Sequence, residues 1–184
     1  EQSKDEMLVV GCGTGNEISS IIRKDPKWKI TGVAPSPEMV SQAREKLSGY
    51  PNVTLVDGRV SDLPGNESFG SASLLLVLHF LPDDGAKLAL LKDISSRMKS
   101  GGKLVILDIT GEPSQIRNNL QVLKFMIPPG ISQEEIAERL QRIEQELHHV
   151  PEDRLIELLA LADFEPPLRF FQSAIYMGWI VKKK

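Results

Sequence analysis

The sequence is poor in the features that mark several specialised classes of protein. Its single cysteine, Cys12, cannot form an intrachain disulfide. Its 22 Lys and Arg residues stand against 25 Asp and Glu, and the net charge of −3 gives no basic field for a nucleic-acid backbone. The longest apolar run, residues 74–78, is far shorter than the roughly 20 residues of a membrane-spanning helix, and no leader-like pattern opens residues 1–5. We therefore expect a cytoplasmic protein without nucleic-acid or membrane partners.

The length and composition fit one globular unit. The chain has 184 residues, of which 41% are hydrophobic and 26% are charged, which is enough for one sizeable core but not for two. No period of roughly 20 to 50 residues repeats, and no low-complexity tract interrupts the chain. We expect a single domain over residues 1–184.

Strand-like and helix-like segments alternate over the first 110 residues. Short apolar runs are followed by helical patterns, the arrangement that builds a parallel sheet covered on both faces. The second helix has a clear start, because Ser36 can cap it and Pro37 suits its first position. The predicted strands are residues 7–10, 29–34, 53–56, 71–78 and 103–109, and the predicted helices include residues 18–22 and 83–99.

The pattern changes after residue 110. Residues 111–150 are mostly helical and separate the fifth strand from a helix at 151–162, whereas ordinary loops at such places are much shorter. Ser132 and Glu135 have the spacing of a capping box. The apolar stripe that follows consists of Ile136, Leu140, Ile143 and Leu147. We interpret this segment as an insertion whose stripe packs on the sheet domain, with a lid or a homodimer surface as alternatives.

Two strands rich in aromatic residues, 168–172 and 174–181, close the chain. They are separated by a short turn and have the pattern of an antiparallel hairpin. Together with the five preceding strands they predict an α/β fold, with a mostly parallel seven-stranded sheet, a terminal antiparallel hairpin and helices on both faces.

The sharpest motif is a glycine-rich loop at residues 11–16, which reads Gly-Cys-Gly-Thr-Gly-Asn. It lies between the first strand and the first helix, where glycines let the backbone approach a ligand and helix amides face it. A dinucleotide-binding loop of the form G-x-G-x-x-G would need glycine at Asn16, but the third glycine is Gly15.

The G-x-G-x-G form of this loop resembles motif I of the class I, Rossmann-like S-adenosylmethionine-dependent methyltransferases. Residues 31–39, 58–64 and 76–81 resemble that family's ribose-side loop, adenine-side loop and fourth-strand end, in the family's order. Residues 100–106 and 162–164 resemble its entries into strands five and six, so the resemblance covers nearly the whole chain. Within the family, 78–109 and 171–181 are similar to small bacterial methyltransferases and in part to carboxy-S-adenosylmethionine synthases.

The resemblance implies that S-adenosylmethionine is the cofactor and that a small molecule receives its methyl group. Glycines and apolar side chains of the loops would hold the adenosine and the methionine end of this cofactor. The cofactor-binding residues implied are Gly11, Cys12, Gly13, Gly15, Ala34, Pro35, Met39, Arg59, Val60 and Leu75.

Four positions at which the family commonly has an acid carry none here. They are occupied by Val9, Ala34, Arg59 and Gly70. The acid that Ala34 replaces would bind both ribose hydroxyls, and a hydrogen bond to a charged group contributes about 1.5–3 kcal/mol. We therefore expect the cofactor still to bind, but roughly 10–100-fold more weakly than with the acid present.

Arg59 has two interpretations. An arginine beside a lost ribose acid can accept the 2′-phosphate of a dinucleotide, or its long side chain can lie across the solvent-open edge of the pocket. We favour the second, and a nucleotide-dependent oxidoreductase is further disfavoured by Asn16 and Ala34.

Methyl transfer from a sulfonium depends on alignment of nucleophile, carbon and sulfur more than on acids or bases. His79, predicted at the end of the fourth strand, is the best candidate for a base, with a hydrogen bond to backbone as its alternative role. Cys12 is interpreted as the small residue that the glycine turn needs, not as a reactive thiol. His148 and His149 are adjacent and diverge, so we expect no metal site.

The leading hypothesis is a methyltransferase acting on a small metabolite, with residues 111–150 closing over the substrate. The alternative is a protein of the same fold that binds a metabolite or a protein partner without catalysis. Methyltransferases of this kind commonly carry N-terminal helices over the cofactor, and we expect part of this cover to be absent from the chain. The acceptor atom depends on such covering elements, so the sequence leaves it open.

Overall fold

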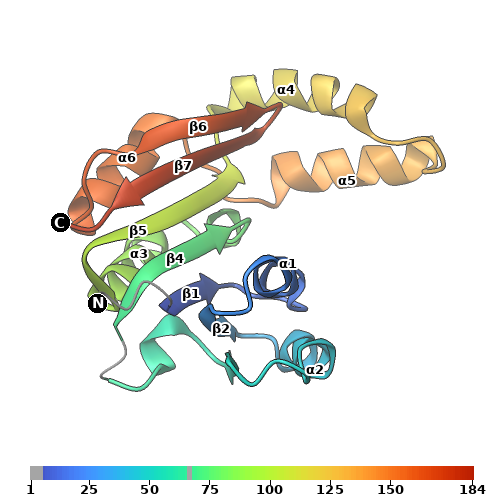
Figure 1. Cartoon of the computed structure of the whole chain (residues 1–184). Coiled ribbons are helices and arrows are strands. Elements are labelled where there is room, and N and C mark those ends of the chain that lie inside the picture. Colours follow the sequence, from blue (N-terminus) through green and yellow to red (C-terminus); the bar gives the residue numbers. More distant parts are fainter. Residues whose placement is uncertain (1–5, 66–67) are drawn as a thin grey trace.

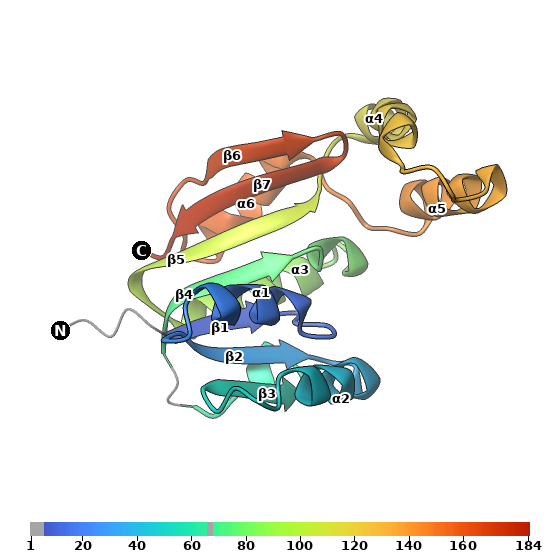
Figure 2. The same ribbon diagram turned by 45° about the vertical axis from the view of Figure 1, so that its right-hand side comes forward.

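A seven-stranded sheet lies between two layers of helices in the computed structural model, which describes residues 6–65 and 68–184 (Figures 1 and 2). The strand order is β3-β2-β1-β4-β5-β7-β6. Neighbours among β1–β5 are parallel, whereas β7 runs antiparallel to both β5 and β6. The strands are β1 (Glu6–Val10), β2 (Lys29–Ala34), β3 (Val53–Asp57), β4 (Phe69–Leu75), β5 (Met98–Ile109), β6 (Leu168–Ser173) and β7 (Tyr176–Lys182). The predicted α/β fold and terminal hairpin are confirmed.

The helices divide between the two faces of the sheet. α1 and α2 cover β1–β3 on one face, and α3 and α6 cover the other face (Figure 2). α4 and α5 form a hairpin beyond the ends of β5 and β7 (Figure 1). The helices are α1 (Asn16–Lys24), α2 (Pro37–Lys46), α3 (Ala86–Ser96), α4 (Pro113–Met126), α5 (Gln133–Gln145) and α6 (Glu152–Leu161), with short 3-10 turns η1 (Val60–Asp62) and η2 (Leu78–Phe80).

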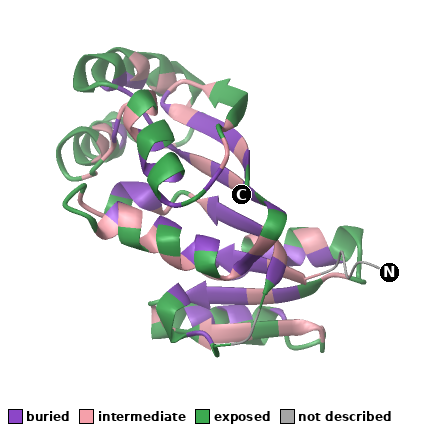
Figure 3. Cartoon of the chain, turned by 90° about the vertical axis from the view of Figure 1, so that its left-hand side faces the viewer, coloured by how far each residue is buried: buried purple, intermediate pink, exposed green. Residues whose placement is uncertain are grey.

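The central strand β1 shows why the sheet has helices on both faces. Leu8 and Val10 pack with the residues of α3 and α6, whereas Val9 between them packs with α1 and α2. All three side chains are buried, as expected for a parallel strand covered on both sides. Figure 3 shows the same distribution, with buried residues along the sheet and exposed residues on the outer faces of the helices.

The fourth strand is shorter than predicted. The predicted strand was residues 71–78, but β4 ends at Leu75 because Leu76 adopts a φ of +57°. The chain then turns through η2. His79 therefore lies in a 3-10 turn and not at the end of a strand, which corrects the prediction.

The helix predicted at 83–99 is also shorter, and the strand after it is longer. Gly85 has a φ of +112° and precedes α3, which ends at Ser96. β5 already starts at Met98, five residues before the predicted start at 103, and Gly101 and Gly102 lie inside the strand where its register with β4 is irregular. The glycines permit this irregularity since Gly101 has a φ of +77°.

Residues 111–150 contain the predicted helices. The capping box is present: the Glu135 amide donates to Ser132 Oγ at 3.1 Å, and the Ser132 amide donates to Glu135 Oε2 at 3.0 Å. The stripe of α5 packs inside the chain, against α4 and the ends of β5 and β7. This cluster contains Ile109, Ile116, Leu120, Ile136 and Ile175, with Leu140, Ile143, Leu147 and Tyr176 at its edge.

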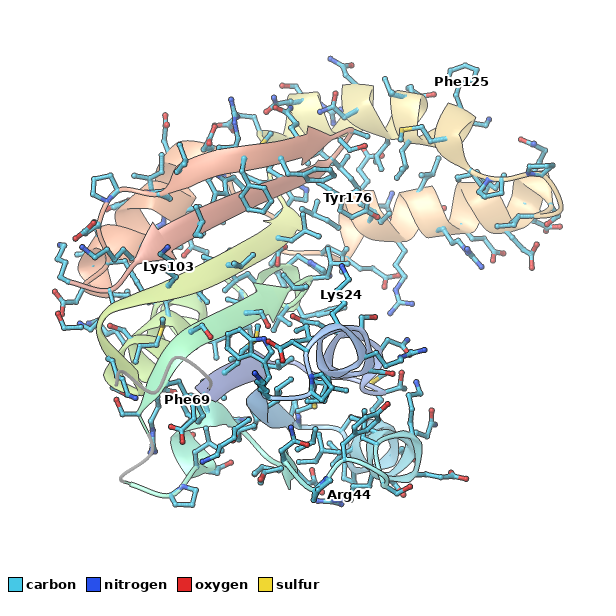
Figure 4. The ribbon with its side chains drawn as sticks, viewed as in Figure 1. Lys24, Arg44, Phe69, Lys103, Phe125 and Tyr176 are labelled. Carbon is cyan, nitrogen blue, oxygen red and sulfur yellow. The ribbon has the colours of Figure 1, made fainter. Side chains whose placement is uncertain are left out.

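The outer side of α4 carries the apolar side chains that remain open to solvent at this end of the molecule. Phe125 is 90% exposed and points away from α5, whereas Tyr176 lies on the side facing the insertion (Figure 4). Val122 and Met126 are exposed as well.

Within the described residues, no helix combines the length and apolarity that crossing a bilayer requires.

The centre of the sheet should dominate the stability of the fold. Leu74 on β4 is fully buried, so Leu74→Ala is expected to lower the free energy of unfolding by about 2–5 kcal/mol through lost burial and a cavity. Leu161→Ala, at an exposed leucine of α6, should change it by less than about 0.5 kcal/mol. Urea denaturation followed by circular dichroism measures both, and equal effects would contradict this assignment of the core.

Candidate functional site

The glycine loop follows β1 at the carboxyl edge of the sheet. Gly11, Gly13 and Gly15 have φ of +73°, +51° and +78°, conformations that favour glycine. The amides of Gly11 and Cys12 both donate to the Val33 carbonyl, at 2.8 and 3.1 Å, and the Gly15 amide donates to the Cys12 carbonyl at 2.9 Å. These bonds fix the loop against β2, so these three amides are engaged within the chain.

The glycine loop touches the turn that follows β4. A Cβ at Gly11 would lie only 2.4 Å from Cγ2 of Val77. Because β1 and β4 are adjacent parallel strands, the segments that leave their carboxyl ends meet at this point. Gly11 is therefore required both by its positive φ and by the space that Val77 occupies.

A cleft of about 420 Å³ opens beside this contact, within the usual range for small-molecule sites of about 300–1,000 Å³. Its walls come from the ends of β1 and β2, the loop after β3, the turn after β4 and one face of α3. The lining residues are Val10, Gly11, Val33, Pro35, Gly58, Arg59, Val60, Val77, Leu81, Ala86, Ala89, Leu90 and Asp93. The cleft is thus mainly apolar with two ionisable side chains, Arg59 and Asp93.

Four of the predicted cofactor residues line this cleft, namely Gly11, Pro35, Arg59 and Val60. The others are not among its lining residues. Cys12 and Ala34 are buried in the core with α1 and α2. A Cβ at Gly15 would meet Leu47 and Ala43 of the second helical segment, while Met39 is half exposed on α2. Gly13 and Leu75 complete this second group.

Sequence reasoning missed the contribution of α3 to the cleft. Ala86, Ala89, Leu90 and Asp93 recur at spacings of three, one and three residues, so they share one side of the helix. Leu91 and Ile94 lie on the other, core-facing side of the helix. The second stripe was available as a signal, because two alanines and an acid on one helix face suggest close approach of a ligand more than core packing.

Cys12 has no sign of reactivity. Burial raises the pKa of its thiol to about 11, the opposite of the lowering expected for an activated thiol at a helix N-terminus. The thiol is therefore protonated near neutral pH, which supports the interpretation of Cys12 as a structural residue.

A buried carboxylate fixes the turn after β4. Asp108, on β5, is 2% exposed. Its Oδ2 accepts from the amides of Val77 and Leu78, at 3.1 and 2.8 Å, and its Oδ1 accepts from the amide of Ile109 at 2.8 Å. His79 Nδ1 lies 2.8 Å from the same Oδ1. The sequence analysis did not identify Asp108, because no motif distinguishes it from the other residues of the predicted fifth strand.

Lys87 contributes a second charge to this region. Lys87 is 1% exposed, and its ammonium donates to the carbonyls of Leu78 and His148, at 2.5 and 2.6 Å. Burial lowers the pKa of Lys87, while the negative charges of Asp108 and Asp83 act in the opposite direction. Lys87 thus joins the turn after β4 to the end of the 111–150 insertion.

His79 lies inside this network. It is 5% exposed and packs against Phe80, with ring centroids 4.2 Å apart. The cavity that it lines with Lys87 and Asp108 measures only about 10 Å³, which is about the space of one water molecule. The alternative raised from the sequence was a hydrogen bond to backbone, but the ring nitrogen pairs with a carboxylate instead.

The two adjacent histidines do not form a metal site in this structure. The His148 amide donates to the His79 carbonyl at 2.8 Å, and burial lowers the pKa of the His149 side chain. Among residues 6–65 and 68–184, no group of three or more His, Cys, Asp or Glu side chains could hold a metal ion.

Sequence comparison relates the chain to methyltransferases. Residues 7–102 match the family described as "Methyltransferase domain". The demethylmenaquinone methyltransferases of Staphylococcus aureus strains JH9 and Newman are 30% identical to the chain over 125 residues. The alignment covers 66% of this chain and 51% of each relative, so the match extends over about half the length of these curated relatives.

Solved methyltransferases share the fold. The N,N-8-amino-8-demethyl-D-riboflavin dimethyltransferase of Streptomyces davawensis superposes with a TM-score of 0.72 at 17% identity, over 98% of this chain and 50% of that chain. The plantazolicin methyltransferase gives 0.72 at 14% identity, over 98% and 77%. The mitomycin 7-O-methyltransferase gives 0.70 at 16% identity, over 98% and 49%. The strand order, the glycine loop and the family match over more than half of its residues together assign this chain to the methyltransferase domain family.

Proposed function

We propose that the cleft binds S-adenosylmethionine and that the chain transfers its methyl group to a small molecule. The observation that carries this proposal is the apolar cleft of about 420 Å³ between the glycine loop and the loop after β3. In open α/β sheets, ligands bind at the carboxyl edge where the strand order reverses. Here the order reverses between β1 and β4, and both strands lead into the cleft.

The names of the relatives support a small-molecule acceptor. They describe enzymes that act on demethylmenaquinone, mitomycin and a riboflavin derivative. The N-acetylserotonin methyltransferase was solved with SAM, and the N-methyltransferase NodS with S-adenosyl-L-homocysteine. These relatives support the cofactor and the class of acceptor, not one particular acceptor for this chain.

The proposed chemistry is an in-line displacement. An acceptor atom attacks the methyl carbon, the bond between this carbon and the acceptor forms, and the carbon–sulfur bond breaks with its electron pair left on sulfur. S-adenosylhomocysteine and the methylated acceptor are the products, and the acceptor's proton passes to a base or to water. The cleft would contribute alignment of acceptor atom, methyl carbon and sulfur, which can supply a large part of the rate enhancement in such a displacement.

His79 remains the proposed base. Because Asp108 accepts from Nδ1, the neutral imidazole has its free lone pair at Nε2, which can take a proton. Because His79 is buried and packs against Phe80, an acceptor can reach Nε2 only after this turn rearranges.

Several other expectations are part of the proposal. The cofactor would contact Cys12, Gly13, Gly15, Ala34, Met39 and Leu75 only after the site closes, because none of them lines the cleft. A cytoplasmic location rests on the single cysteine. A homodimer through 111–150 would use the exposed outer side of α4, since the stripe of α5 already packs inside the chain.

The first test is calorimetric titration with S-adenosylmethionine and S-adenosylhomocysteine, with NADPH as control. We expect micromolar binding of the first two ligands and none of NADPH. Failure of both to bind at millimolar concentration would contradict the proposal. Binding without transfer to any acceptor in a broad metabolite screen would favour the non-catalytic alternative, and NADPH binding would favour the dinucleotide interpretation of Arg59.

Gly11→Ala should weaken binding of S-adenosylhomocysteine at least about 10-fold. A φ of +73° costs an L-residue roughly 1–2 kcal/mol, and the added Cβ would displace Val77 from the cleft wall. Gly49→Ala is the control, because a Cβ there meets nothing within 4 Å. Calorimetry of both variants measures the effect, and wild-type affinity in Gly11→Ala would contradict the assigned cleft.

Asp93→Asn should change how the cleft discriminates purines. A carboxylate beside an apolar base site can accept from the exocyclic amine of adenine, and such a bond contributes about 1.5–3 kcal/mol. We expect the wild type to prefer S-adenosylhomocysteine to S-inosylhomocysteine, which has a carbonyl at that position, by about 10-fold or more. Asp93→Asn should lose this preference.

The matched control for this comparison is Asp153→Asn, an exposed acid of α6 that does not line the cleft. It should keep the wild-type ratio of the two affinities. An unchanged ratio in Asp93→Asn would show that Asp93 does not contact the base.

A further inference from the structure

Buried polar groups concentrate at the base of the insertion. Among residues 6–65 and 68–184, seven polar or charged residues are buried, and four of them meet here: His79, Lys87, Asp108 and Thr110. Burial of a charged group is unfavourable unless the group is paired and hydrogen-bonded. The concentration of such groups at one place therefore calls for a specific role.

Lys87 connects two segments that are distant in the sequence. Its ammonium donates to the carbonyl of Leu78 in η2 and to the carbonyl of His148 after α5. The His148 amide in turn donates to the His79 carbonyl. The end of the insertion is thus held to the turn after β4 by bonds in both directions, and Lys87 supplies two of the three.

The same turn forms one wall of the cofactor cleft. Val77 and Leu81, on either side of η2, both line the cleft. Lys87 itself lies in the first turn of α3, between the cleft-lining residues Ala86 and Ala89. A displacement of η2 or of this turn of α3 would change the shape of the cleft.

The end of the insertion is also tied to its beginning. Thr110 and Val150 form a parallel β-bridge, and the Gly111 amide donates to the Val150 carbonyl at 3.1 Å. Residues 148–150 therefore contact the start of the insertion, η2 and Lys87 at once. Residues 148–150 themselves do not line the cleft.

We propose that Lys87 is a positioning residue that couples the helical insertion to the cofactor cleft, by holding residues 148–150 against the turn after β4. Occupation of the cleft then stabilises the docked insertion, and the docked insertion stabilises the cleft, because both use the same position of η2. This coupling is reciprocal, as any linkage between two binding equilibria is. It rests on the proposed function only in the identity of the ligand.

The test is hydrogen exchange measured by mass spectrometry, with and without S-adenosylhomocysteine, on the wild type and Lys87→Met. Amides held by a local contact exchange faster when that contact is lost. In the free protein, Lys87→Met should exchange about 10-fold faster in peptides covering 76–81 and 146–151, with β1 and β2 unchanged. In the wild type, S-adenosylhomocysteine should slow exchange in 146–151. In Lys87→Met this slowing should disappear, and S-adenosylhomocysteine should bind about 10-fold more weakly.

Lys92→Met is the matched control, because Lys92 is exposed on the same helix. It should behave as the wild type in every measurement. If Lys87→Met does not fold, Lys87→Gln keeps an uncharged amide donor on a shorter side chain and should give the same changes at smaller amplitude.

The outcomes separate the coupling from the proposed function. Wild-type exchange in 146–151 of a folded Lys87 variant, with the same slowing by ligand, would overturn the inference. Weaker ligand binding with unchanged exchange in 146–151 would also overturn it, since Lys87 would then support the cleft alone. If the wild type binds no S-adenosylhomocysteine, the proposed function fails, while exchange in the free proteins still tests whether Lys87 holds the insertion.

Discussion

The site depends on one buried carboxylate. Asp108 accepts from the amides of Val77 and Leu78 and pairs with His79, so two amides and one ring nitrogen of the turn after β4 have a protein partner. The turn leaves β4 through the positive φ of Leu76, a conformation that persists only where its surroundings determine it. Asp108 supplies that determination from the neighbouring strand, and the wall of the cleft, the position of His79 and the docking of the insertion all follow from it.

Much of the fold could be predicted because it is encoded locally. Apolar runs and helical periodicity located the strands and helices, Ser132 and Glu135 located a helix start, and the three glycines of residues 11–15 located the turn after β1. The errors occurred at boundaries where long-range contacts override local pattern. Leu76 follows the last residue of β4, and Gly85 precedes the first residue of α3. Both have a positive φ, which hydrophobic periodicity does not reveal.

The site was predicted less completely because its residues come together only through the sheet. Gly11, Pro35, Arg59 and Val60 stand beside recognisable loop motifs, and they line the cleft. The sequence does not distinguish Asp93 from other acids on helices. It lines the cleft only because α3 packs over the sheet beside it. Lys87 and Asp108 are charged, and charged residues are expected at the surface. Their burial is possible because each is hydrogen-bonded to backbone groups.

The contact between Gly11 and Val77 has a consequence for how such a site can change over evolution. Two loops from different strands share one small volume, so the residue at position 11 limits what position 77 can be. A relative with a side chain at the first position would need a smaller residue at the second, together with a way to relieve the positive φ. The two positions are expected to vary as a pair, and the outline of the cleft can shift only when both change together.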